Sequence, residues 1–362
     1  MSYKVPSICL KFSYLLLFLL FFQFLYAQKK TKNLGTEHFP DFDALLTQKQ
    51  KMLGDNVVAM IWKDTLVYKR ELGDFTADTK APIASCSKWL TAALAMEFVD
   101  EGKISLDDKV SKYIPLFSLY NKNYITIRLC LSHMTGIKSE PIRLKTLIEE
   151  RRKYASLEEE VNDFAKTEIQ SNPGTEFSYS NIGLNIVGRI LEIVSKKKFD
   201  MLIRTRLFVP LGMRQSTFST LDGSAINPSG GAISTAADYM HFLQMLLNNG
   251  KYEGARILSE ESVKAMRQVQ TTPEVIKYAP KVAEGYNYAL GSWVIDNNAQ
   301  HVGTVLTCPG LFGTWPMVDY CRGYACIFFV KTLLGEQKKD TYIQLTDVLN
   351  AQMPSTCNGP NP

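Results

Sequence analysis

Strand-like segments lie at both ends of this 362-residue chain, and helical patterns lie between them. Near the start, residues 57–62 and 65–72 have the pattern of a β-hairpin around a Lys63-Asp64 turn. The last third predicts four more strands, within residues 286–296, 301–307, 311–320 and 323–334. Because no strand–helix–strand alternation links these segments, the pattern favours an α+β fold. Its antiparallel sheet is assembled from both chain ends.

The residues between and after the strands predict the helical part of the fold. Residues 40–53, 235–250 and 341–353 have apolar side chains near helical spacing. Residues 105–220 consist mostly of helical patterns and loops. We therefore expect one domain at 28–353, in which helices flank the sheet and a mainly helical region occupies about 105–220. Residues 354–362 are expected to form a loose tail.

The first 27 residues have the pattern of a secretory signal peptide. Lys4 and Lys11 precede an apolar run from Tyr14 to Tyr26, and the small Ala27 is followed by polar residues. The run is short for a membrane span, although the large Leu25 leaves an uncleaved anchor as the alternative. We expect an exported protein, periplasmic or secreted, with no stable membrane span after cleavage.

The composition gives no indication of a nucleic-acid partner and does not determine how the cysteines pair. The net charge is +5, with acidic and basic residues interspersed, so nothing points to nucleic acid. Apart from Cys9 in the signal, the cysteines are Cys86, Cys130, Cys308, Cys321, Cys326 and Cys357. Their spacing matches no metal site, and we expect no metal or cofactor. Export permits disulfides; most of these cysteines are expected to be buried thiols, and the pairing is undetermined.

Ser85 and Lys88 are the first candidates for chemistry. They lie three residues apart at the start of a predicted helix, so both side chains project from one face. The rest of this helix is apolar, and burial favours the neutral amine of a lysine. A neutral lysine beside a hydroxyl can take its proton and make the serine a nucleophile.

A second Ser-x-x-Lys match, Ser195 and Lys198, shows how easily this spacing arises by chance. It closes a helix within a run of lysines, where the charges are solvated. The Ser85 helix differs because it continues into apolar sequence.

Tyr179 and Asn181 are the second pair of candidates, in the only Tyr-x-Asn of the chain. A phenol can relay a proton to a leaving group, and an amide can hold a substrate carbonyl. The structural alternative makes Asn181 a helix cap and Tyr179 a residue at the edge of the core. No Gly-x-Ser-x-Gly motif is present, which argues against an α/β-hydrolase, and the four histidines are scattered.

Together these stretches resemble the serine β-lactamase and penicillin-binding-protein superfamily, and most of all its class C β-lactamase-related group of esterases and peptidases. "IASCSKWLTAALAMEFVDEG" resembles the Ser-x-x-Lys helix of the family and "PGTEFSYSNIGLNIVG" its Tyr-x-Asn region. "LCLSHMTGI", "SGGAISTAADYMHFLQMLLNNG" and "YALGSW" are similar to three further family segments. The matches follow the family order from about residue 43 to 335.

The third motif departs from the family pattern, which is Lys or His, then Thr, Ser or Gly, then Gly. His301-Val302-Gly303 has these letters but lies early in the chain. Cys308-Pro309-Gly310 lies where a shortened loop would place the motif, and we favour it. Such a site lacks the cation that would hold a substrate carboxylate, which argues against an efficient β-lactamase or carboxypeptidase.

The resemblance implies an acyl-enzyme serine hydrolase acting on an amide or ester of a small molecule or peptide. In it Ser85 is the nucleophile, Lys88 and Tyr179 share the base work, and Asn181 positions the substrate. The oxyanion lies between the N–H of Ser85 and the N–H after Gly310. A carboxylesterase of the same fold and a non-catalytic binding protein are the alternatives.

Overall fold

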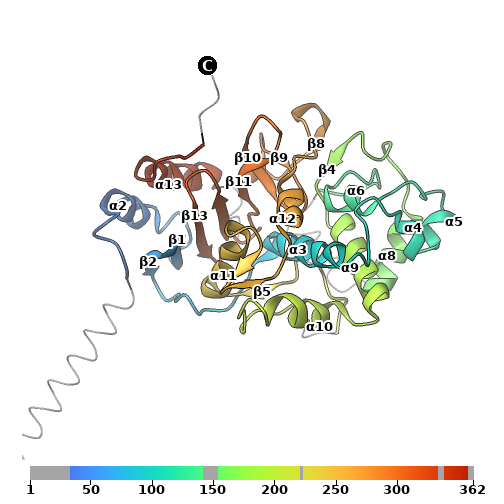
Figure 1. Cartoon of the computed structure of the whole chain (residues 1–362), viewed down its shortest axis with the longest axis horizontal. Coiled ribbons are helices and arrows are strands. Elements are labelled where there is room, and N and C mark those ends of the chain that lie inside the picture. The colour runs from blue at the N-terminus through green and yellow to red at the C-terminus, as the bar shows by residue number, and fades with distance from the viewer. Residues whose placement is uncertain (1–32, 142–153, 221–222, 333–337, 358–362) are drawn as a thin grey trace, which may run out of the picture.

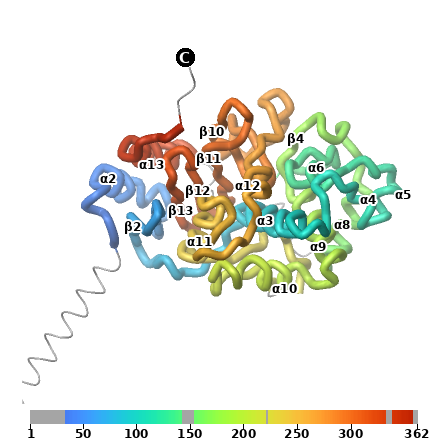
Figure 2. The backbone as a smooth tube through the Cα atoms, in the orientation of Figure 1, coloured from blue at the N-terminus to red at the C-terminus, as the bar shows by residue number. Residues whose placement is uncertain are grey.

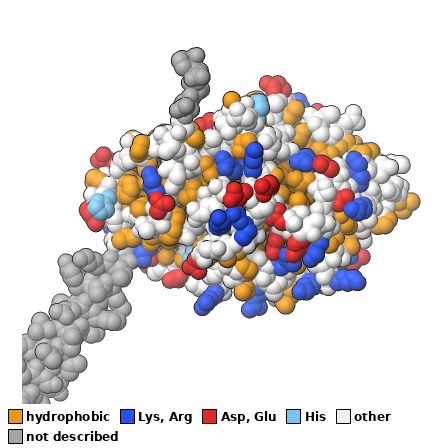
Figure 3. All heavy atoms as spheres, in the orientation of Figure 1, with side chains coloured by type: hydrophobic (Ala, Val, Ile, Leu, Met, Phe, Trp, Pro, Cys, Tyr) orange, Lys and Arg blue, Asp and Glu red, His pale blue; other side chains and the backbone are white. Residues whose placement is uncertain are grey.

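The computed structural model describes residues 33–141, 154–220, 223–332 and 338–357. The predicted signal peptide at 1–27 lies outside the described residues. Within them, no helix is both long enough and apolar enough to cross a membrane. Figure 3 shows acidic and basic side chains interspersed over the face in view, as the sequence indicates.

A seven-stranded antiparallel sheet joins the two ends of the chain, in the order β2-β1-β13-β12-β11-β10-β9. Its strands are β1 (Val57–Lys63), β2 (Thr65–Leu72), β9 (Asn287–Tyr288), β10 (Trp293–Asn297), β11 (Gly303–Thr307), β12 (Trp315–Asp319) and β13 (Tyr324–Val330). The N-terminal β1 pairs directly with the C-terminal β13, in a register that aligns Val57 with Val330. This confirms the predicted α+β fold with a sheet built from both chain ends.

Helices cover both faces of the sheet, and they bury the side chains on both sides of its central strands. Val57, Ala59 and Ile61 of β1 pack toward α2 (Pro40–Lys49) and α13 (Lys339–Ala351). The alternate residues Val58 and Met60 join the core that contains α3 (Ser87–Asp100) and α11 (Ala236–Leu247). The two terminal helices α2 and α13 lie side by side (Figure 2).

A helical region occupies the other end of the molecule (Figure 1). Its helices are α4 (Val110–Tyr113), α5 (Leu116–Leu119), α6 (Ile127–Leu131), α8 (Leu157–Lys166), α9 (Ile182–Ser195), α10 (Phe199–Ile203) and the π-helix η2 (Arg204–Phe208). α3 runs between the sheet and this region and packs on α9. The start of α3 therefore lies where the two parts of the fold meet.

Short elements complete the fold around α3. They are the 3₁₀ turns η1 (Ala84–Cys86), η3 (Pro273–Val275) and η4 (Lys281–Ala283), the helix α12 (Glu260–Arg267), and the strands β3 (Ala81–Pro82), β4 (Phe177–Ser178), β5 (Ile233–Ser234), β6 (Lys251–Tyr252), β7 (Ala255–Arg256) and β8 (Ile276–Tyr278). β3 pairs with β5, and β4 pairs with β8. These two pairs anchor the segments that lead into η1 and into α9.

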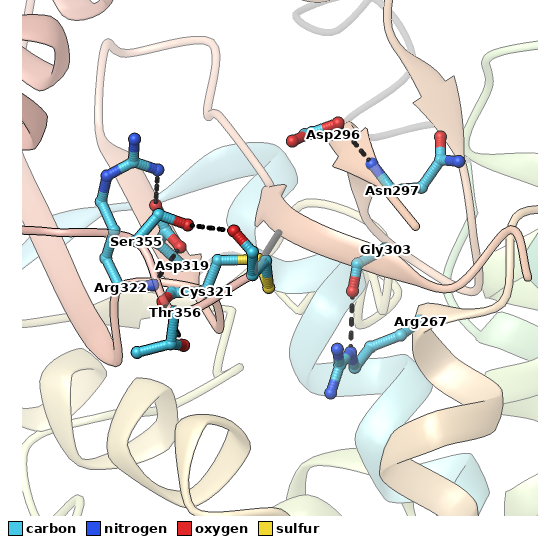
Figure 4. Close-up of a disulfide and its surroundings, with 10 residues drawn as sticks. Arg267, Asp296, Asn297, Gly303, Asp319, Cys321, Arg322, Ser355 and Thr356 are labelled. Carbon is cyan, nitrogen blue, oxygen red and sulfur yellow. Dashed lines mark hydrogen bonds and ion pairs between the residues drawn. A yellow bond between two sulfur atoms is a disulfide. The ribbon is translucent and has the colours of Figure 1, made fainter. Parts of the chain in front are cut away.

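The first residues of the tail are attached to the sheet, contrary to the expectation of a loose tail. Cys357 forms a disulfide with Cys321, which lies just after β12 (Figure 4). The N–H and the hydroxyl of Thr356 both donate to the carbonyl oxygen of Cys321, each at 2.7 Å. The covalent bond and these two hydrogen bonds attach residues 356 and 357 to the end of β12, and residues 358–362 lie outside the described part. The other four described cysteines are buried thiols.

Removing this disulfide should lower the stability of the fold. For a separation of 36 residues, loop-closure entropy predicts a loss of about 3–4 kcal/mol in the Cys321→Ser/Cys357→Ser variant. Thermal unfolding of the oxidised wild type and of this variant measures the loss. A reductant should lower the Tm of the wild type to that of the variant and leave the variant unchanged; equal Tm values for the two proteins before reduction would contradict the prediction.

Candidate active site

Ser85 is presented at a strained turn between β3 and α3. Ala84, just before it, has a φ of 45°, in the left-handed region that non-glycine residues rarely adopt. Ser87 holds this turn: its hydroxyl donates to the carbonyl oxygen of Ala84 at 2.5 Å and accepts from the N–H of Ala232 at 3.0 Å. Ser85 itself remains partly exposed, so its hydroxyl is available at the surface of the turn.

Lys88 lies one helical turn further on and has no exposed surface. Its Nζ lies 3.4 Å from Ser85 Oγ, 3.1 Å from Asn181 Oδ1 and 3.0 Å from the carbonyl oxygen of Ser229. Burial disfavours the ammonium form and lowers the pKa of Lys88 to about 7. A large fraction of Lys88 is therefore a neutral amine at neutral pH.

The three partners of Lys88 determine where its lone pair points after deprotonation. The ammonium donates one proton to each of three oxygens, whereas the amine retains two protons and gains one lone pair. Asn181 Oδ1 and the Ser229 carbonyl only accept hydrogen bonds, but the Ser85 hydroxyl can also donate. The lone pair of neutral Lys88 therefore faces the Ser85 hydroxyl, which is the arrangement that a general base requires.

The structure brings Tyr179 and Asn181 to the same place. The centre of the Tyr179 ring lies 4.8 Å from Lys88 Nζ, and only 2% of this residue is exposed. Asn181 occupies the N-cap position of α9, but its side chain makes no capping hydrogen bond. Because its Oδ1 accepts from Lys88 instead, the helix-cap alternative does not account for this side chain.

His133, which the sequence did not single out, supports Tyr179. Its ring lies 4.6 Å from the Tyr179 ring, and its Nδ1 accepts from the N–H of Ser180 at 3.4 Å. Nε2 then carries the proton and faces the hydroxyl of Tyr288 at 3.0 Å. Burial, with the nearby Lys88, holds the pKa of His133 well below its usual range, so this ring is neutral. Only its place in "LCLSHMTGI" could have indicated this role.

Ser229 and Asn185 also contribute to the surroundings of Lys88, and the sequence analysis did not identify either residue. The Ser229 hydroxyl lies 2.7 Å from the carbonyl oxygen of Asn181 and 2.6 Å from Asn185 Oδ1. The N–H of Ser229 also donates to Asn185 Oδ1, at 3.0 Å. These contacts fix the carbonyl that accepts from Lys88. The fully buried Asn185, one turn after Asn181 on a helix that is otherwise largely apolar, was the available signal.

Cys308, and not His301, lies beside Ser85. The Cys308 thiol donates to the carbonyl oxygens of Ser85, at 3.2 Å, and Gly291, at 3.4 Å. Gly310 passes so close to the chain before Ser85 that an added Cβ would lie 2.3 Å from the carbonyl oxygen of Ile83. His301 is exposed and lies at the opposite end of β11, where its carbonyl oxygen accepts from Val269 N–H.

Ser195 and Lys198 differ from the Ser85 pair as the sequence indicates. Lys198 is exposed, and the Ser195 hydroxyl lies 3.5 Å from the carbonyl oxygen of Glu192 within its own helix. Among the described residues, no three His, Cys, Asp or Glu side chains are placed to hold a metal ion. The described site is therefore built from hydroxyl, amine, phenol, amide and backbone groups.

Similarities to known proteins show the fold class of this chain and the family to which it belongs. A putative β-lactamase from Bacteroides dorei has a similar structure, with a TM-score of 0.74 and 27% identity over 86% of this chain and 99% of that one. The fold is thus that of the serine β-lactamase and penicillin-binding-protein superfamily. The β-lactamase family model matches residues 42–348, and the chain belongs to the β-lactamase family.

Two other proteins resemble this chain over different shares of its length. Penicillin-binding protein 4 of Amycolatopsis lactamdurans is 30% identical over 226 residues, which are 53% of this chain and 58% of that protein. The chain thus matches little more than half of that relative. A family VIII carboxylesterase has a TM-score of 0.69 with 15% identity over 87% of this chain and 97% of that one, which shows a shared fold.

Gly310→Ala should destabilise the contact between residues 308–310 and η1. Its Cβ would approach a backbone oxygen at 2.3 Å and the Cys86 sulfur at 3.2 Å, so the backbone must shift, at a cost of about 1–3 kcal/mol. Gly230→Ala is the matched control, because its Cβ would meet nothing closer than 3.6 Å. Urea unfolding of both variants tests this, and equal losses would contradict it.

Proposed function

We propose that this protein is an exported serine hydrolase that cleaves an ester or amide through an acyl-enzyme. The observation that carries the proposal is the buried Lys88, whose pKa is lowered to about 7 by burial and whose Nζ lies 3.4 Å from Ser85 Oγ. A lysine that is partly neutral at neutral pH can act as a general base. The Ser195 and Lys198 pair offers no such arrangement, because Lys198 is exposed.

In the first half-reaction, neutral Lys88 takes the proton of the Ser85 hydroxyl as Oγ attacks the substrate carbonyl carbon. A new C–O bond forms, and the carbonyl oxygen becomes an oxyanion. We place this oxyanion between the N–H of Ser85 and the N–H of Leu311, which follows Gly310. The contact of Cys308 with the Ser85 carbonyl supports this placement, because it joins the two backbone segments.

The leaving group then departs with a proton, and water completes the reaction. Tyr179 shares the base work and passes the proton to the leaving oxygen or nitrogen, while the carbonyl re-forms as the Ser85 ester. The side-chain amide of Asn181 positions the substrate by hydrogen-bonding to a substrate carbonyl group. A water molecule next attacks this ester, the acid is released, and the Ser85 hydroxyl is restored.

Export is supported by two separate features. The first 27 residues have the pattern of a signal peptide. The Cys321–Cys357 disulfide suits an oxidising compartment. Both favour a periplasmic or secreted enzyme.

The substrate class is an ester or amide of a small molecule or peptide, and the neutral Cys308 favours the carboxylesterase candidate. Relatives in fold include a family VIII carboxylesterase, and a sequence relative is a penicillin-binding protein. The intact contacts among Ser85, Lys88 and Asn181 argue against a non-catalytic binding protein, because binding alone requires no lysine with a lowered pKa.

Ser85→Ala should abolish covalent labelling by a serine-directed acylating probe, because it removes the attacking oxygen. Intact mass spectrometry after exposure to an activated ester or a fluorophosphonate measures this. Ser195→Ala is the matched control and should label like the wild type. Labelling that persists in Ser85→Ala would overturn the assignment.

The acylation rate should depend on pH through Lys88. Because the base acts when neutral, the rate should rise about tenfold per pH unit below the midpoint and level off above it. The midpoint is expected near 7, the pKa to which burial lowers Lys88. Lys88→Arg, whose side chain stays protonated, should lose about 10²–10⁴-fold. A profile that is flat across about pH 5–9 would contradict this role for Lys88.

A further inference from the structure

Lys88 is the charged side chain that contacts Ser85 among the described residues. Cys86, Cys308 and His133 are buried titratable groups of this region, beside the buried phenols of Tyr179 and Tyr239. Burial is the largest influence on the pKa of each of the first three. Among the lysines, arginines and carboxylates, Lys88 is the only one that contributes to any of the three shifts. Among the described residues, Lys88 is thus the cation that acts on these three groups, and its Nζ also contacts Ser85 Oγ.

The ammonium group of Lys88 is already hydrogen-bonded to groups of the protein. Lys88 Nζ contacts Ser85 Oγ, Asn181 Oδ1 and the Ser229 carbonyl oxygen. These three acceptors account for all three of its protons. Lys88 must also be neutral when it accepts the proton of Ser85, so its charge is lost in the form that reacts. It does not supply a lasting positive charge to a substrate.

The segment opposite Lys88 supplies no charge either. Cys308 is fully buried, and its thiol donates to the carbonyl oxygens of Ser85 and Gly291. Burial raises the pKa of this thiol to about 12, so it is neutral. Pro309 and Gly310, which follow, have no polar side-chain atoms. The side chain of Cys308 thus joins two backbone segments of the protein, and residues 308–310 offer no charged side chain.

The arginine packed beside β11 is also occupied elsewhere. Arg267 Nε donates to the carbonyl oxygen of Gly303 at 2.9 Å, as Figure 4 shows. Its guanidinium carbon lies 3.5 Å from the centre of the Tyr320 ring. These contacts hold it at the far end of β11 from Cys308.

A substrate carboxylate near the scissile bond would therefore be disfavoured in two ways. Among the described groups of the site, it would find no cation except protonated Lys88, which cannot act as the base, so its removal from water is costly. It would also stabilise the protonated form of Lys88, because a nearby negative charge favours an ammonium ion. Less of the lysine would then be available as a base at neutral pH. Both effects act against an anionic substrate.

We propose that Cys308 is a specificity-determining residue, and that this site selects esters or amides that carry no negative charge next to the scissile carbonyl. The inference rests on the proposed acyl-enzyme function. It narrows the substrate class to neutral acyl compounds and disfavours compounds with a carboxylate beside the leaving group. Charge at a greater distance along the substrate is not affected.

A matched pair of aryl esters tests the proposal: 3-acetoxybenzoate, which is anionic, and its neutral methyl ester. Each enzymatic kcat/KM is divided by the hydroxide-catalysed rate constant of the same ester, which removes the difference in leaving-group reactivity. The wild type should prefer the neutral ester about tenfold or more. Equal normalised values, or a preference for the anionic ester, would overturn the proposal.

Two substitutions at Cys308 test whether charge sets this preference. Cys308→Lys should shift the ratio about tenfold toward the anionic ester, whereas the neutral, unbranched Cys308→Met should keep the wild-type preference. An equal shift in both variants would overturn the role of charge. Circular dichroism establishes that each variant is folded before it is assayed.

A third measurement uses the wild type alone and decides the matter even where Cys308→Lys fails to fold. The pH dependence of the first-order acylation rate constant, measured in the pre-steady state at saturating ester, reports groups in the enzyme–substrate complex. With the anionic ester bound, Lys88 should hold its proton more tightly, so the rise of this rate constant with pH should have a higher midpoint than with the neutral ester. Coincident midpoints would contradict the proposal. If neither ester acylates Ser85, the proposed function fails as well, an outcome distinct from acylation without discrimination.

Discussion

The burial of one lysine is the constraint on which the rest of this structure depends. Lys88 has no exposed surface, yet its Nζ contacts three acceptors, which come from η1, the start of α9 and the loop before β5. An amine can be buried in this way only where polar atoms are fixed around it. The Ser229, Asn185 and Asn181 contacts provide that fixation. The same burial that makes the lysine costly to fold makes it a base near neutral pH.

The architecture explains how residues so distant in sequence meet around this amine. The sheet closes the two chain ends through β1 and β13, and the helical region is inserted between the strands. α3 crosses from one part to the other, so its first turn faces residues 308–310 after β11 on one side and α9 on the other. Neither part alone contains the complete set of groups.

The sequence predicted what depends on local pattern. The hairpin, the C-terminal strands, the Ser85 helix and the family all followed from spacing and motif order, and the structure and comparisons confirm the fold. Contacts between distant segments were not predictable, because a single polar residue has no periodicity. His133 is one of four histidines scattered along the chain, and Ser229 begins a segment whose one signal is its similarity to a family segment. Likewise, nothing in "PSTCNGPNP" indicated that Cys357 pairs with Cys321.

Ala84 carries a consequence for how such an enzyme changes over generations. Its left-handed φ of 45° stores free energy that a glycine would release, because glycine adopts this conformation without strain. A more flexible residue here would also loosen the turn that presents Ser85. Selection for a more stable protein and selection for a well-placed Ser85, the proposed nucleophile, then act in opposite directions on one small side chain. Substitutions that stabilise the protein are therefore expected to accumulate at other positions, while Ala84 is retained.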